Sequence, residues 1–319
     1  MKAVLLTEPT EAKNIVLRQC AIPEVKPGWV LVRIMAFGLN HSEQILRQSE
    51  ITAPYIKKPI IPGIECVGEI ADASDSHFSV GEKVVALMGG MGRSFNGSYA
   101  EYALLPSHHV FSIVSKLSWE HLAAVPETYF TAWGSLFECL HLKPDDTLLI
   151  RGATCALGYA AIQLAKAFGC KVLATTHRES KLHLLEQAGV DLPLLDTGSL
   201  KGKIAGVTKA LELVGPKTLM DTLNCIEKGV IVCQTGVLGG IYSLNNFDPI
   251  KDIPNGVFLT GFYSNMPTQD VMDDIFDYLN IYHLLPGIGK VYPFSQIAKA
   301  CEDMDAGRVN GKIVIKLDE

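Results

Sequence analysis

Short apolar runs, separated by glycine and proline, fill the first third of the chain. They have the length of β-strands and lie at 30–34, 66–70 and 83–87. Turn signals separate them, at Pro27-Gly28, Pro62-Gly63 and Val80-Gly81-Glu82. The start of the chain also predicts a short strand. Residues 1–110 therefore predict a small, mostly β module.

From about residue 120 the pattern changes to strands that alternate with helices. The apolar run Thr147–Arg151 predicts a strand, and the helix after it places Ala161, Leu164, Ala165 and Phe168 on one face before Gly169 ends it. A second strand at 171–175 and a second helix at about 180–187 follow. Further apolar runs predict strands at 192–195, 218–220, 230–235 and 257–262. This alternation predicts an α/β fold with a doubly wound parallel sheet.

The tail returns to β texture at 311–316, after a helix expected near 295–306. We expect it to rejoin the first module. A chain of 319 residues is long enough for two hydrophobic cores.

Composition and charge exclude several classes of protein. With 48% hydrophobic and 19% charged residues the chain is globular, and a net charge of −6 without a dense Lys or Arg run argues against nucleic acid or an anionic membrane surface as the main partner. No apolar stretch is long enough to cross a bilayer, and the first residues lack a leader pattern. We expect a cytoplasmic protein.

The eight cysteines are scattered, and no two form a C-x-x-C pair. This spacing fits neither a secreted disulfide framework nor a structural zinc site. We expect mostly buried thiols.

The strongest chemical signal is the segment from Gly152 to Gly158, between the first strand and the helix of the second module. A dinucleotide's pyrophosphate binds at such a helix N-terminus. The usual G-x-G-x-x-G is imperfect here, because only its third glycine, Gly158, is kept. The alternative is an ordinary strand-to-helix turn. The predicted cofactor contacts are Ala153, Thr154, Cys155, Ala156, Leu157 and Gly158.

The end of the second strand indicates which dinucleotide binds. An NAD site usually has a carboxylate there for the ribose 2′-hydroxyl, but this chain has no carboxylate before Glu179. Cations and hydroxyl groups suit a 2′-phosphate, so we predict NADPH. Arg178 and Lys181 are assigned to the phosphate, with help from Thr176 and His177. The alternative is a solvated helix start with incidental charges.

A set of short motifs accompanies the loop at 152–158, in a specific order and spacing. They lie at 38–43, 62–68, 80–84, 97–102, 131–133, 142–146 and 310–314. With these motifs the whole chain resembles the medium-chain dehydrogenase/reductase superfamily, in its zinc-free quinone oxidoreductase-like branch. The resemblance implies a GroES-like β-rich catalytic domain at 1–122 and 266–319, and a Rossmann NADP(H)-binding domain at 123–265.

Zinc-dependent members of this superfamily have Cys, His and Cys where this chain, matched motif to motif, has Asn40, Ile64 and Glu127. Ile cannot bind a metal and an amide is a poor zinc ligand, so we predict no metal site. A substitute site from His41, Glu43, Glu65 and Glu127 is not supported by any metal-binding motif. Without a Lewis acid, alcohol oxidation is disfavoured, whereas quinones and α,β-unsaturated carbonyls accept hydride directly.

The resemblance also implies roles for single residues. Asn40 is expected at the acceptor, Glu43 beside it, and Tyr55 and Tyr129 near the acceptor and nicotinamide. Asn40 could instead be a turn residue, and Glu43 a surface carboxylate. Expected cofactor contacts are Thr131, Val237, Leu238, Phe262, Tyr263, Asn310 and Lys312, although Lys312 could instead form a structural salt bridge. No convincing general acid is found; His41 is one candidate.

The predicted activity is thus an NADPH-dependent reductase of quinones or enones. Two alternatives remain: an enoyl-thioester reductase of the same fold, and a non-enzymatic NADPH-binding sensor or structural protein. By resemblance we expect a homodimer that pairs through the sixth strand of the parallel sheet.

Overall fold

The chain forms two units, one of residues 1–130 and 264–319 (unit 1) and one of residues 131–263 (unit 2). The structure, a computed structural model, describes residues 1–318. The sequence places the domain boundaries after residues 122 and 265, whereas the units change at 130/131, inside a helix, and at 263/264.

Unit 2 contains a parallel sheet with the strand order β10-β9-β8-β11-β12-β13. The side chains of Leu148, Leu149 and Ile150 on the central strand β8 are fully buried, as expected for a strand covered on both faces. The predicted doubly wound parallel sheet is confirmed. Its strands are β8 (Thr147–Arg151), β9 (Lys171–Thr176), β10 (Leu192–Leu195), β11 (Lys209–Glu212), β12 (Ile231–Gln234) and β13 (Phe258–Gly261).

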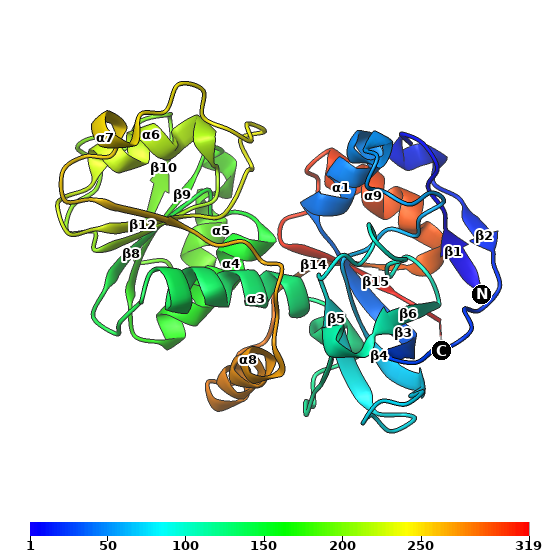
Figure 1. Cartoon of the computed structure of the whole chain (residues 1–319). Helices are drawn as coiled ribbons and strands as arrows, with labels where there is room; N and C mark the ends of the chain where they lie inside the picture. The colour runs from blue at the N-terminus through cyan, green and yellow to red at the C-terminus, as the bar shows by residue number, and fades with distance from the viewer. Residues whose placement is uncertain (319) are drawn as a thin grey trace. The chain divides into compact units, whose positions relative to one another are not determined.

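Helices cover both faces of this sheet, with α4 and α5 on one face and α6 and α7 on the other (Figure 1). They are α4 (Ala156–Ala167), α5 (Leu182–Gln187), α6 (Pro216–Cys225) and α7 (Pro249–Asp252). Two shorter elements are the π-helix η4 (Gly134–Cys139) and the 3-10 helix η5 (Glu179–Lys181).

One predicted strand is wrong. Residues 218–220 lie in α6, and the strand that precedes this helix is β11. Gly215, with a φ of 94°, and Pro216 at the first helical turn start α6. Thr218, Leu219, Thr222 and Leu223 then recur at helical spacing and are buried together.

The main sheet of unit 1 has the order β14-β15-β3-β4-β5-β7, with β6 also paired to β3. The tail strand β15 pairs antiparallel with β3, as the pattern of the tail predicts. The strands are β3 (Trp29–Leu39), β4 (Glu65–Asp72), β5 (Lys83–Leu87), β6 (Tyr102–Pro106), β7 (Val110–Ser112), β14 (Ile288–Pro293) and β15 (Lys312–Lys316), beside the separate pair β1 (Lys2–Val4) and β2 (Leu17–Gln19).

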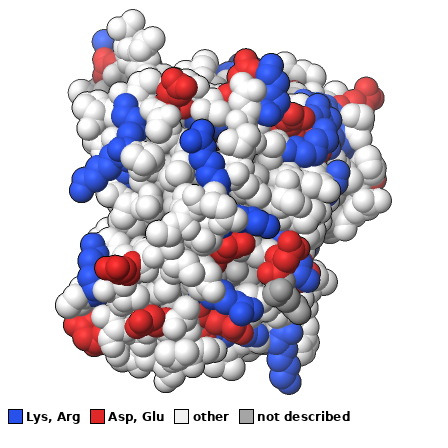
Figure 2. Space-filling view, turned by 90° about the vertical axis from the view of Figure 1, so that its right-hand side faces the viewer, with Lys and Arg blue, Asp and Glu red and all other residues white. Residues whose placement is uncertain are grey.

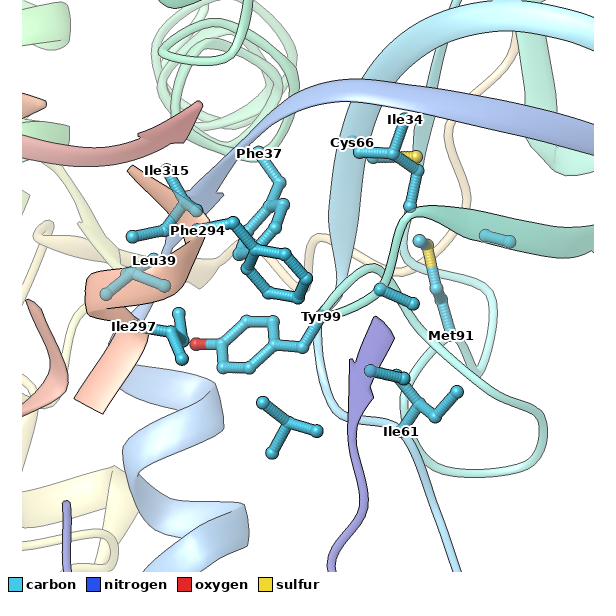
Figure 3. Packing of buried hydrophobic residues seen from close by; sticks show 14 of the residues in the cluster. Ile34, Phe37, Leu39, Ile61, Cys66, Met91, Tyr99, Phe294, Ile297 and Ile315 are labelled. Atoms are coloured by element: carbon cyan, nitrogen blue, oxygen red, sulfur yellow. The ribbon is translucent and has the colours of Figure 1, made fainter. Parts of the chain in front are cut away.

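Aromatic rings lie at the centre of the unit 1 core (Figure 3). The ring of Phe37 stacks on Tyr99 at 5.0 Å and meets Phe294 edge-on at 5.9 Å. The helices of this unit are α1 (His41–Gln48), α2 (Trp119–Leu122), α3 (Pro126–Trp133, which continues into unit 2), α8 (Gln269–Ile281) and α9 (Ile297–Asp305). Short 3-10 helices are η1 (Ala12–Asn14), η2 (Glu50–Thr52), η3 (Ser107–His109) and η6 (Phe294–Gln296).

On the face drawn in Figure 2, Lys and Arg side chains are interspersed with Asp and Glu and form no broad single-sign field. None of the helices within residues 1–318 combines the length and apolarity that a membrane span needs.

Candidate functional site

The loop after β8 is built around two glycines. Gly152 has a φ of 81°, and a Cβ on it would lie 2.8 Å from the Val214 side chain. Gly158 packs against the loop so closely that a Cβ would lie 2.2 Å from the carbonyl oxygen of Ala153. The loop is tied to β9, because the N–H of Gly152 donates to the Thr175 hydroxyl at 3.0 Å. This is the close helix-to-strand packing that a dinucleotide loop requires.

Cys155 caps the helix that follows the loop. Its Sγ accepts the N–H of Gly158 at 3.3 Å, so this helix-start N–H already has a partner. Burial raises the pKa of the Cys155 thiol. The helix α4 therefore begins with fewer unbonded N–H groups than it would have with glycine at position 155.

Cationic groups lie at the end of β9. His177 and Arg178 are exposed and Lys181 is half-buried, and within residues 1–318 neither Arg178 nor Lys181 forms an ion pair with a carboxylate. Burial, followed by the charge of Arg178, lowers the pKa of Lys181. The hydroxyl of Thr176 is buried and shares a hydrogen bond with Thr154 at 3.1 Å. The structure thus brings together the predicted phosphate-binding residues.

Lys217, at the start of α6, joins this group and was missed in the sequence. Its stem packs over Gly239, where a Cβ would lie 2.8 Å from the Lys217 Cβ. The pKa of His177 is lowered by burial and then by the positive charges of Arg178, Lys181 and Lys217. The signal was available: Lys217 follows β11, and the carboxyl ends of parallel strands share one edge of the sheet.

Behind the loop, Arg151 is fully buried at the end of β8. Its guanidinium donates to Asp196 at 2.7 Å and to Asp221 at 2.8 Å, and also to the hydroxyl of Thr222 at 2.9 Å. That hydroxyl in turn donates to the buried carboxylate of Glu212 at 2.6 Å. This network joins β8, β11, α6 and the segment after β10. The positive charge of Arg151 is balanced by carboxylates within the network.

In unit 1, Asn40 lies at the start of α1 within a buried polar cluster. Its backbone N–H donates to Glu43 at 2.8 Å, and its side-chain Nδ2 donates to Glu65 at 2.8 Å. Its Oδ1 accepts from Lys312 Nζ at 2.7 Å. Lys312 also forms an ion pair with Glu65 at 2.5 Å. For Lys312 the structure therefore shows the structural salt bridge that the sequence left open.

Glu43 is buried, and its carboxyl also accepts the N–H of Ile64 at 3.0 Å. Burial, and then the negative charge of Glu65, raise the pKa of Glu43 to about 7. A buried carboxyl of this kind holds its proton close to neutral pH.

A second polar group in unit 1 contains Tyr55. This side chain is 63% exposed, and its hydroxyl donates to Glu50 at 2.9 Å. Glu50 also forms an ion pair with Arg93 at 2.8 Å, and Arg93 donates to the hydroxyl of Ser42 at 2.9 Å. The structure thus links Tyr55 to Ser42 through Glu50 and an arginine that sequence reasoning did not identify.

Comparison with known proteins agrees with this architecture. Residues 26–115 match the alcohol dehydrogenase GroES-like domain, and residues 156–275 match the zinc-binding dehydrogenase family. Human quinone oxidoreductase is 28% identical over 332 residues, covering 99% of this chain and 98% of that protein. The chain belongs to the medium-chain dehydrogenase/reductase superfamily, in its quinone oxidoreductase-like branch.

Solved structures show the fold of this superfamily, a Rossmann domain with a GroES-like domain. AibC is similar with a TM-score of 0.89 and 25% identity, over 100% of this chain and 96% of that one. The yhdH oxidoreductase of Salmonella enterica, solved in complex with NADP, has a TM-score of 0.85 and 21% identity, with 100% of both chains covered.

The sequence resemblance matches three positions, Asn40, Ile64 and Glu127, to the zinc ligands of other members. Ile64 is buried, the Asn40 amide is bonded to Glu65 and Lys312, and a Glu127 oxygen accepts from Ser264 at 3.2 Å. No group of three or more His, Cys, Asp or Glu side chains suited to a metal ion occurs in the described part of the chain.

The remaining residues predicted to contact the cofactor or the acceptor range from buried to exposed. Tyr129 is only 2% exposed, and burial raises the pKa of its hydroxyl well above the ordinary value. Phe262 packs on Gly134, where a Cβ would lie 2.0 Å from the ring. The others are Thr131 (buried), Val237 (half-buried) and the exposed Leu238, Tyr263 and Asn310.

Proposed function

We propose that this chain is an NADPH-dependent reductase that transfers hydride to a quinone or an α,β-unsaturated carbonyl without zinc. The observation that carries the proposal is a group of three cations beside a dinucleotide-type loop, Arg178, Lys181 and Lys217, which form no ion pair with a carboxylate within residues 1–318. The similarity to quinone oxidoreductases over nearly the whole chain supports the acceptor class.

The residues of unit 2 suit an adenosine 2′-phosphate. Phosphate carries about two negative charges and binds best to cations that have no competing carboxylate. Arg178 supplies a planar donor, and Lys181 and Lys217 supply point charges. The Thr176 hydroxyl, which is bonded to Thr154, also fixes the end of the strand.

Bound NADPH would supply the hydride, and the protein has to orient the acceptor and exclude water. In unit 1 we assign the acceptor side to Asn40, Glu43 and Tyr55. The superfamily's metal-dependent alcohol chemistry is not proposed, because the residues at the three ligand positions include an isoleucine and an amide.

The activity is tested by NADPH oxidation with 9,10-phenanthrenequinone and with a simple enone. We expect turnover with NADPH and much slower turnover with NADH. Arg178→Ala should weaken the binding of NADPH about tenfold or more, because a charged hydrogen bond is lost, and leave the binding of NADH nearly unchanged. Arg18→Ala, another exposed arginine on β2 (Leu17–Gln19), is the matched control. Equal loss for both cofactors contradicts the assignment.

A second candidate is a protein that binds NADPH without turning over. The observation that favours it is Cys155, which caps α4 and occupies a helix-start N–H. If NADPH raises the melting temperature but no quinone or enone is reduced, this candidate replaces the first. Cys155→Gly should then tighten NADPH binding, because glycine leaves that N–H open and gives the pyrophosphate more room.

A further inference from the structure

The side-chain amide of Asn40 is held from both ends. Lys312 Nζ can only donate, and it donates to Oδ1 at 2.7 Å. Glu65 Oε1 accepts from Nδ2 at 2.8 Å. A flipped amide would set its oxygen against a carboxylate and its NH₂ group against an ammonium. The Glu65–Lys312 pair therefore allows one amide orientation.

This ion pair is deeply buried, with side-chain exposures of 2% for Lys312 and 0% for Glu65. The second oxygen of Glu65 accepts the backbone N–H of Glu127 at 2.8 Å. Buried ion pairs contribute little net stability, because desolvation offsets their attraction, and apolar groups often replace them without loss. A contribution to the stability of the fold therefore does not explain why Glu65 and Lys312 form a buried ion pair here.

The neighbouring strand leaves space for the pair. A Cβ on Gly38 would lie 2.2 Å from Lys312 Cε and 2.4 Å from Glu65 Oε1. Gly38 on β3 is paired with Val314 on β15 and lies two residues before Asn40. Three strands, β3, β4 and β15, therefore supply the parts that fix one amide.

The second hydrogen of Asn40 Nδ2 is held only weakly. Its acceptor is Glu43 Oε1 at 3.5 Å, which is the long limit of a hydrogen bond, and Asn40 is half-buried, so an acceptor oxygen can take this hydrogen from Glu43. A donor fixed in advance stabilises negative charge on an oxygen more than a donor that must first turn.

We propose that Glu65 and Lys312 are positioning residues, which hold the Asn40 amide so that its second, weakly bonded N–H faces the oxygen of the acceptor. The proposal rests on the proposed function. In that reaction two electrons move as hydride from NADPH to the acceptor, NADP⁺ forms, and the resulting enolate or hydroquinone anion takes a proton from water. The fixed N–H stabilises the anion before it is protonated.

The test uses the double variant Glu65→Gln/Lys312→Met in the full-length protein, with NADPH and 9,10-phenanthrenequinone. The variant keeps the shape, removes both charges and lets the amide turn. We expect kcat to fall about 10- to 100-fold, below the effect of removing an oxyanion donor outright, with the KM for NADPH unchanged. The matched control is Glu120→Gln/Lys316→Met, which removes a more exposed ion pair between α2 and β15, the strand that also carries Lys312. It should keep wild-type kcat.

Asn40→Ala separates positioning from a general structural role. It should lower kcat in the wild type but add little in the double variant, because both changes act through the same amide. Additive losses, or a wild-type kcat in the double variant, would overturn the proposal.

A readout independent of turnover is the exchange of the Asn40 side-chain amide protons, followed by NMR after ¹⁵N-asparagine labelling. We expect the hydrogen bonded to Glu65 to exchange slowly in the wild type and faster in the double variant. Fast exchange of that hydrogen in the wild type refutes the held amide whatever the activity, and this measurement needs no variant. No turnover of any acceptor by the wild type refutes the proposed function itself.

Discussion

Arg151→Met tests the buried network behind the phosphate-binding loop. Arg151 is fully buried, and its guanidinium forms ion pairs with Asp196 at 2.7 Å and Asp221 at 2.8 Å. Methionine fills much of the volume but leaves two carboxylates without their cation. Breaking a buried pair in this way costs about 3–5 kcal/mol, so we expect the free energy of unfolding at neutral pH to fall by about that amount.

The sign of the pH dependence follows from the two carboxyls. Burial raises the pKa of Asp196, but its hydrogen bonds, with Arg151 first among them, outweigh burial and the net pKa lies below the ordinary 3.8. The pKa of Asp221 is also lowered, by hydrogen bonds to Ser199, Leu200 and Arg151 that outweigh burial. A carboxyl whose pKa is lowered by folding stabilises the fold at any pH above its pKa in the unfolded chain. This stabilisation is lost as pH falls through its pKa in the folded protein. The difference in the free energy of unfolding between the wild type and Arg151→Met should therefore shrink below about pH 4.

Urea denaturation followed by circular dichroism measures both effects. The control is Lys166→Met, which removes a pair with Asp191 whose side chains are about one-third exposed, and should cost about 0–1 kcal/mol. Adding Asp196→Asn and Asp221→Asn to Arg151→Met should restore part of the loss. A loss near that of the control, or one that stays constant down to about pH 3, would refute the reasoning.

Three further predictions concern other parts of the chain. Burial and the charge of Glu65 raise the pKa of Glu43 to about 7, so its bound proton should stabilise the fold fully below the ordinary carboxyl pKa of 4.5, and this contribution should be lost as pH rises through about 7. Glu43→Gln should flatten that part of a melting-temperature profile, and an unchanged profile would contradict the prediction. Gly158→Ala should lower the melting temperature by several degrees, since its Cβ would meet the loop backbone at 2.2 Å, whereas Gly287→Ala, which meets nothing within 4 Å, should not. We expect a homodimer through the edge strand β13. The N–H of Phe258 donates to Val230 on the β12 side, so the N–H of Leu259 faces the open edge. Leu259→Pro should therefore yield monomers in sedimentation analysis, and an unchanged oligomer would exclude this edge.

Local signals were enough to predict which residues from one stretch of chain lie together at the candidate site. The loop at 152–158 lies between a buried strand and an amphipathic helix, and the cations Arg178 and Lys181 follow the next strand directly. Such neighbours in sequence are neighbours in space, because a parallel sheet brings consecutive strand ends to one edge.

The parts that come from distant segments were not predictable in the same way. Lys312 reaches Glu65 and Asn40 because β15 pairs with β3 and Gly38 leaves room, and this register is set by the packed sheet. Arg151 meets Asp196 and Asp221 for the same reason. The strand expected at 218–220 was wrong, since an apolar triplet does not distinguish a strand from the buried face of α6.

The most direct test of the account is calorimetric titration of the purified protein with NADPH and with NADH. The cations at the end of β9, Arg178 and Lys181, predict that NADPH binds at least about tenfold more tightly than NADH, with an advantage that shrinks as salt is added. Equal affinity for the two cofactors, or no measurable binding of either, would contradict it.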